Sequence, residues 1–200
     1  MFSANQDYGK VKVLLDINII IKLRDKEPSP EILALKASWL EAEVSFYYAA
    51  ECFNEILRDE DSRRRKETRA FLKQYLRAEP DSDLVAESLP VLDAIITGES
   101  VNDTSDKKQI AEAISTGILN FITTDGNLLK KRESVFAALG ISIYSPEEFI
   151  INIDEAVNSD SYFPARLAGT NYSFKRISAK EIPAVENSFF RKGVKGSKVV

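Results

Sequence analysis

The chain has 200 residues, enough for one α/β domain with its own hydrophobic core plus an appendage. It contains one Cys and no His, which excludes a disulfide framework, a cysteine zinc site and any metal site or mechanism that needs histidine. The net charge of −4 is uneven: residues 164–200 carry +6 and residues 1–163 carry −10, so nucleic-acid binding would depend on local basic patches.

The first half of the chain alternates apolar runs of strand type with segments of helical periodicity. The run that ends at Asp16 is rich in Val and Leu, and Pro28 and Pro30 mark a clear break after the segment that follows it. In chain order we predict strands over residues 11–16 and 44–47, and helices over 30–40, 49–58 and 62–78.

The second half continues the alternation. We predict helices over residues 83–97, 106–117 and 128–139, strands over 120–123 and 141–144, a loop over 98–103 and a polar connector over 151–163. Asp103 and Asp106 resemble an acidic capping pair, and Ser145, Pro146 and Glu148 form a helix-start signature. The pattern predicts an α/β fold whose central, mostly parallel sheet is covered on both faces, as a domain over residues 1–150 with a C-terminal extension over 151–200.

Four acidic residues are the candidate functional site. Asp16 and Asp125 each end an apolar run, Glu55 lies in a helical stretch, and Asp106 is expected to open a helix. Carboxylates at the carboxyl ends of parallel strands converge in one crevice, where they repel unless they share protons or bind a hard cation. Singly, each could instead cap a helix or sit in solvent. Glu51, one turn from Glu55, could replace it.

The order of these acids resembles that of the PIN-domain nucleases. The matching segments are LLDIN (residues 14–18), ECFNEI (51–56), SDKKQIAEA (105–113) and FITTD (121–125). The resemblance implies a three-layer α/β/α fold and an endoribonuclease for single-stranded RNA that depends on Mg²⁺ or Mn²⁺. By position it implies a catalytic and metal-binding quartet of Asp16, Glu55, Asp106 and Asp125, flanked by the auxiliary polar residues Asn18 and Thr124.

Basic residues cluster in the helix predicted over residues 62–78. Four of them are candidate RNA contacts: Arg63, Lys66, Arg69 and Lys73. They could form a phosphate track, with Arg77 one turn further along the same helix. They could equally form a solvated face balanced by Asp59, Glu60, Asp61 and Glu67. Residues 130–132, close after Asp125, offer a second basic group.

The stretch from residue 162 to 190 is similar to the first strand and helix of GNAT-type acetyltransferases. It lacks the glycine-rich acetyl-CoA loop, so the similarity implies only the start of a truncated acetyltransferase domain, continued in a longer protein. The alternative is a basic C-terminal extension that packs on the domain, contacts RNA or binds a partner. The expected partners are RNA and a second copy of the chain, as a homodimer. No apolar run reaches membrane-span length and no signal peptide is visible, so we expect a cytoplasmic protein without membrane contact.

Two other functions remain open from the sequence. A PIN-like binding or scaffolding module with little catalysis could act through its C-terminal extension. A phosphatase of the haloacid-dehalogenase type would place a second Asp two residues after the first, where this chain has Asn18.

Overall fold

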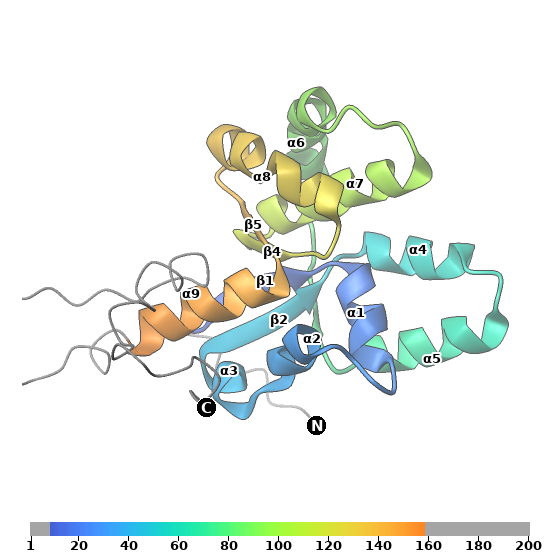
Figure 1. The fold of residues 1–200 in the computed structure, drawn as a ribbon. Helices are drawn as coiled ribbons and strands as arrows, with labels where there is room; N and C mark the ends of the chain where they lie inside the picture. The colour runs from blue at the N-terminus through green and yellow to red at the C-terminus, as the bar shows by residue number, and fades with distance from the viewer. Residues whose placement is uncertain (1–8, 159–200) are drawn as a thin grey trace, which may run out of the picture. The chain divides into compact units, whose positions relative to one another are not determined.

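A computed structural model describes residues 9–158 of the chain (Figure 1). Five strands form one fully parallel sheet in the order β3-β2-β1-β4-β5. They are β1 (Val11–Leu15), β2 (Val44–Tyr48), β3 (Leu76–Arg77), β4 (Asn120–Ile122) and β5 (Ser142–Tyr144). In register, β1 pairs Leu15 with Tyr48 of β2 on one side and with Ile122 of β4 on the other. The sequence order therefore reverses direction at β1 and β4, in the middle of the sheet.

The helices lie on both faces of this sheet, and the predicted three-layer α/β/α architecture is confirmed. The helices are α1 (Ile17–Arg24), α2 (Pro30–Leu33), α3 (Ser38–Glu43), α4 (Glu51–Arg58), α5 (Ser62–Leu72), α6 (Ser82–Ile95), α7 (Val101–Ser115), α8 (Gly126–Leu139) and α9 (Pro146–Asn158). Figure 1 shows α6, α7 and α8 gathered together, with α1, α2, α3 and α5 across the strands from them. Right-handed crossovers require this division, because the chain moves one way from β1 to β3 and the other way from β3 to β5.

The hydrophobic core follows the central strands. Val13, Leu14 and Leu15 of β1 are fully buried or nearly so, as are Phe121 and Ile122 of β4. A strand that is covered on both faces has no solvent side, which explains why these runs are continuously apolar rather than alternating. The two central strands therefore end at fixed positions, and the residues that follow them are held in register.

Several predicted elements in the first half differ from the structure. The helix expected over residues 30–40 is two short helices, α2 and α3, joined by a 3-10 turn over Ala34–Lys36. The helix expected over 62–78 ends at Leu72, and Leu76–Arg77 forms the edge strand β3. Arg77 is thus not on the same helix as the other basic residues. A two-residue strand is too short to produce a periodic signal, and its pairing with Tyr47 and Tyr48 supplies the structure.

In the second half, α7 begins at Val101, five residues before its predicted start at Asp106. Its N-cap is Ser100, which forms a reciprocal capping box with Asp103, so Asp103 and Asp106 are not the capping pair. Pro90 lies inside a continuous α6. The start of α9 is as predicted: the backbone N–H of Glu148 donates to Ser145 Oγ, and the Ser145 N–H donates to Glu148 Oε2.

The helix α9 continues to Asn158, so residues 151–158 are not the polar connector that the sequence suggested. The chain divides into units over residues 1–155 and 156–200, and the architecture above is that of the first unit. The stretch similar to acetyltransferases lies outside the described residues, and the domain boundary at residue 150 stays a prediction. Among residues 9–158, no helix is both long and apolar enough to cross a lipid bilayer.

Candidate acidic site

The first and last acids stand at the point where the chain reverses direction in the sheet. Asp16 directly follows β1 and caps α1, its carboxylate accepting from the backbone N–H of Asn18 at 3.2 Å. Asp125 follows β4 and caps α8, accepting from the N–H groups of Asn127 at 2.6 Å and Leu128 at 3.1 Å. Both acids are therefore helix caps, as the alternative interpretation proposed, and both also lie at the carboxyl edge of the sheet, where ligands of open α/β folds bind.

Asp16 is almost fully buried, with 1% of its surface exposed, and its Oδ2 accepts two side-chain hydrogen bonds. One comes from Asn18 Nδ2 at 2.5 Å and the other from Thr123 Oγ1 at 2.5 Å. Thr123 Oγ1 in turn accepts from the backbone N–H of Asp125 at 2.9 Å. One threonine hydroxyl thus connects the first acid to the last.

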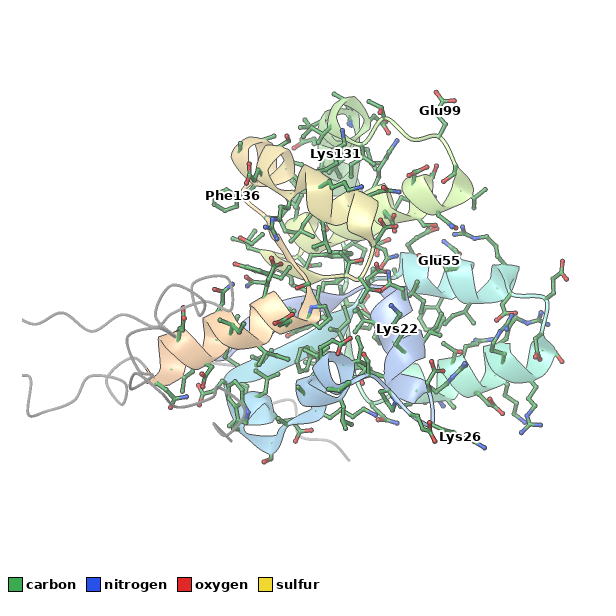
Figure 2. All side chains as sticks on the ribbon, in the orientation of Figure 1. Lys22, Lys26, Glu55, Glu99, Lys131 and Phe136 are labelled. Atoms are coloured by element: carbon green, nitrogen blue, oxygen red, sulfur yellow. The ribbon has the colours of Figure 1, made fainter. Side chains whose placement is uncertain are left out.

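The auxiliary residues named from the resemblance act differently from each other. Asn18 contacts Asp16 directly, whereas Thr124 reaches it only through Asn18, donating to Asn18 Oδ1 at 3.2 Å. Lys22 on α1 donates to Thr124 Oγ1 at 2.6 Å (Figure 2). The sequence analysis missed Thr123, which directly follows β4 and is fully buried. Its position at the end of an apolar strand, two residues before Asp125, could have indicated it.

Glu55 reaches the site from α4 (Figure 2), and its partner is a residue that the sequence analysis did not select. Gln109 on α7 donates from Nε2 to Glu55 Oε1 at 2.5 Å. Its side chain is fully buried, and Cys52 Sγ lies 3.6 Å from its Oε1. Gln109 follows Asp106 by three positions, so both lie on one face of α7. That spacing was the available sequence signal.

Glu51, the alternative to Glu55, is occupied elsewhere. It is buried and accepts from Arg58 Nη2 at 2.7 Å, Asn54 Nδ2 at 2.7 Å and Ser105 Oγ at 3.1 Å. Lys108 Nζ lies 3.7 Å away. These partners make Glu51 a link between α4 and α7 and leave Glu55 as the acid of α4 that faces the other three.

The four acids act on one another electrostatically. Burial raises the pKa of Asp16 to about 6, with repulsion from Asp125 adding to it. Burial together with repulsion from Asp16 and Asp106 raises the pKa of Glu55 to about 8. Burial and repulsion from Asp16 and Asp125 raise the pKa of Asp106 to about 7. Mutual repulsion of this kind requires that the carboxylates lie near each other.

The four acids do not share one coordination sphere in this structure. Within residues 9–158, no group of three or more His, Cys, Asp or Glu side chains stands close enough to hold one metal ion. The hydrogen bonds explain this, since Asp16, Glu55 and Asp125 each point a carboxylate oxygen at a donor of the chain. Coordination by three acids would need side-chain rotation.

Asp106 and Asp125 share a cavity of about 270 Å³ at the N-terminal end of α8. Lys130 and Lys131 line the same cavity, and Figure 2 shows Lys131 on α8. The third basic residue of that run, Arg132, is instead paired with Glu148 at 2.7 Å. Asp103 lines it as well, so three acids and two lysines face a space large enough for a phosphate group and the water around it.

Comparisons with known proteins find no matching family model and no matching curated protein. Among solved structures, the chain is similar to the crystal structure of FitAcB from Neisseria gonorrhoeae, with 16% identity and a TM-score of 0.43 over 67% of this chain and 97% of that one. It is also similar to the structure of FitAB bound to an IR36 DNA fragment, with 17% identity and a TM-score of 0.43 over 67% and 94% of the two chains. Identities and scores this low carry no conclusion about activity, partners or site residues.

Proposed function

We propose that the chain is a Mg²⁺- or Mn²⁺-dependent endoribonuclease that cleaves single-stranded RNA at the site of Asp16, Glu55, Asp106 and Asp125. The observation that supports this most is the placement of these carboxyls around the reversal point of the sheet, where burial, and after it repulsion between them, raises the pKa of three of them. A fold retains such a costly group of acids most readily where a cation or substrate compensates for it.

The chemistry of the donor set suits the proposed ion. The donors are carboxylate oxygens, which are the ligands that Mg²⁺ and Mn²⁺ prefer. When bound, the ion would activate water and stabilise negative charge on the phosphodiester. The chain's own residues would hold the acids and the substrate: Thr123 and Asn18 orient Asp16, Gln109 orients Glu55, and Lys130 and Lys131 offer positive charge beside Asp106 and Asp125.

A specific observation favours the alternative of a binding module with little catalysis. In the described part of the chain Asp16, Glu55 and Asp125 accept hydrogen bonds, and the acids do not form a ready metal cage. If that arrangement persisted with Mn²⁺ present, the site would sense charge without hydrolysing anything. The two proposals differ in what added metal does, so a metal titration separates them.

The test is cleavage of an end-labelled single-stranded RNA by protein freed of metal, followed by addition of Mn²⁺ or Mg²⁺. We expect cleavage only with metal, and its loss in Asp16→Asn and Asp106→Asn purified in the same way. Glu87→Gln, which neutralises an exposed acid in the middle of α6, is the matched control and should cleave like the unmodified protein. Cleavage that survives excess chelator, or that Asp16→Asn retains, would contradict the proposal. Turnover of a small phosphomonoester instead of RNA would favour a phosphatase.

A further inference from the structure

A second concave surface lies away from the acids, between α4 and α5 and beside the carboxyl end of β2. These two helices pack against each other (Figure 1). The α4–α5 groove has a volume of about 620 Å³ and is lined on one side by Tyr48, Phe53 and Leu57 and on the other by basic residues of α5. Tyr48 and Phe53 meet edge to face, with ring centroids 5.8 Å apart. The groove thus combines an aromatic wall with a cationic rim.

The basic residues of α5 differ in their partners. Arg65 lines the groove but donates from Nη1 to the backbone carbonyl oxygens of Asp59 and Glu60. Arg63 is paired with Glu67 at 2.8 Å, and Arg64 is paired with Asp59. Two of the acids that could neutralise the basic cluster, Glu67 and Asp59, therefore pair with cations that do not line the groove. Arg63, one of the four candidate RNA contacts, is thus a paired cation outside the groove.

The other three candidates, Lys66, Arg69 and Lys73, all line the groove and have no ion-pair or hydrogen-bond partner among residues 9–158. Their spacing along α5 places them on one face. The Arg69 guanidinium stands over the Phe53 ring at 5.8 Å, and that of Arg77, from β3, stands over the same ring at 5.5 Å. Arg77 is paired with Glu79 at 3.8 Å, so Arg69 is the cation over this ring that has no acidic partner among residues 9–158. Unpaired cations that border an aromatic ring indicate an anionic ligand with flat apolar parts.

Single-stranded nucleic acid has this chemistry. Its phosphates match the unpaired cations, and its exposed bases can stack on aromatic rings and on guanidinium planes. A duplex offers the same phosphates but keeps its bases stacked inside. An acidic protein segment offers charge but no stacking face.

We propose that the α4–α5 groove binds an unpaired nucleotide of a single-stranded nucleic acid, with its base against Phe53 and the exposed Leu57 and its flanking phosphates on Lys66, Arg69 and Lys73. The inference rests on the proposed function in so far as this strand is the substrate of the acidic site. Phe53 and Glu55 are two positions apart on α4, about 3 Å in rise and on nearly opposite sides of the helix. Groove and acids can therefore be altered separately.

The test measures binding of a fluorescent single-stranded oligonucleotide of about ten residues by anisotropy, without metal so that nothing is cleaved. The variants are Lys66→Gln/Arg69→Gln, which removes two rim charges, and Phe53→Leu, which removes the ring and keeps an apolar side chain. We expect each to weaken binding about tenfold. The double variant should also reduce the slope of log affinity against log salt by about 1.4, because two fewer counterions are released.

The matched control is Arg64→Gln, which removes a cation from the same helix outside the groove. It should bind within about twofold of the unmodified protein at moderate salt, because a paired surface cation contributes little. Circular dichroism and the melting temperature check that Phe53→Leu is folded; the rim residues are exposed or partly exposed, so their double variant tests the groove independently of that. RNA and DNA oligonucleotides of one sequence show which sugar is preferred.

Three results would overturn the inference. If Lys66→Gln/Arg69→Gln binds as tightly as the Arg64→Gln control, the rim residues do not contact the phosphates. If duplex and single strand bind with equal affinity, no base stacks in the groove. Tight binding of polyglutamate that Phe53→Leu does not affect would indicate an acidic protein partner. Failure of the nuclease proposal looks different: the groove variants would still lose binding, while no metal would produce cleavage.

Discussion

Asp16→Asn should make the metal-free protein more stable at high pH. The pKa of Asp16 is raised from an ordinary 3.8 to about 6, chiefly because the carboxyl is buried. Because folding raises this pKa, the protonated Asp16 carboxyl favours the folded state. That stabilisation is fully present at low pH and is lost as the pH rises towards and through the pKa of the folded protein. At about 1.4 kcal/mol per pKa unit, the titration of Asp16 lowers the free energy of unfolding, relative to its value at low pH, by about 1 kcal/mol at pH 4.5 and by about 3 kcal/mol at pH 8.

Asparagine has the same shape and no charge, so this cost disappears. Its carbonyl oxygen can still accept from Asn18 Nδ2 and Thr123 Oγ1, but its amide then faces the backbone N–H of Asn18 and loses that bond. A lost hydrogen bond costs about 1 kcal/mol at any pH. The variant should therefore be about as stable as the unmodified protein at pH 4.5 and about 2 kcal/mol more stable at pH 8.

Urea unfolding at the two pH values, in the presence of chelator, measures this directly. Glu87→Gln is the control, because it removes one carboxylate from an exposed position away from the site. Saturating Mn²⁺ at pH 8 should then stabilise the unmodified protein by mass action and reverse the order of the two. If the advantage of Asp16→Asn does not grow between pH 4.5 and pH 8, the buried carboxylate is not the source of the cost.

Two further changes test the surroundings of the site. Thr123→Val keeps the side-chain shape but removes the hydroxyl that donates to Asp16, so the pKa of Asp16 should rise above about 6; carboxyl carbon NMR titration would show an unchanged pKa if the bond contributes nothing. Glu112→Ala should lower the free energy of unfolding by about 1–2 kcal/mol, because Glu112 Oε2 accepts from the N–H of Glu51 at the start of α4, where Ala50 supplies no cap. A loss no larger than that of Glu87→Ala would contradict this second expectation.

The central strands were predictable because buried strands consist mainly of apolar residues. The run before Asp16 is apolar except for Lys12 and is too short for a helix, which favours a buried strand, and the alternation of strands and helices then implies the parallel sheet. Short elements were not predictable in this way. β3 has two residues, and the pairing with β2 that makes it a strand depends on where distant parts of the chain lie.

Local hydrogen bonding explains the errors at helix ends. Ser100 and Asp103 form the capping box of α7, and the spacing of a hydroxyl and an acid three residues apart is visible in the sequence. Asp103 and Asp106 have the same spacing, and taking them as the capping pair predicts that α7 begins at Asp106, five residues too late. Both pairs satisfy the rule for spacing, and only the rest of the fold decides between them.

The candidate site was predictable as a set of acids but not as a network. Strand-end position alone selects Asp16 and Asp125, because the sheet determines where the ends of its central strands lie. Which neutral side chains hold these acids depends on side-chain direction. Thr123 rather than Thr124 faces Asp16, and Gln109 reaches across from another helix.

The helix α7 explains why the acids and their partners meet. Ser105, Gln109 and Glu112 recur at helical spacing and are buried, although a helix packed against a sheet normally buries apolar residues on such a face. Each is matched to an α4 partner: Ser105 to Glu51, Gln109 to Glu55, and Glu112 to the α4 N-terminus. A polar interface of this kind contributes less to stability than an apolar one of the same size, and it persists here only because its donors and acceptors are paired. Glu55 is thereby held toward Asp16 rather than toward solvent, which is the arrangement that the proposed chemistry requires.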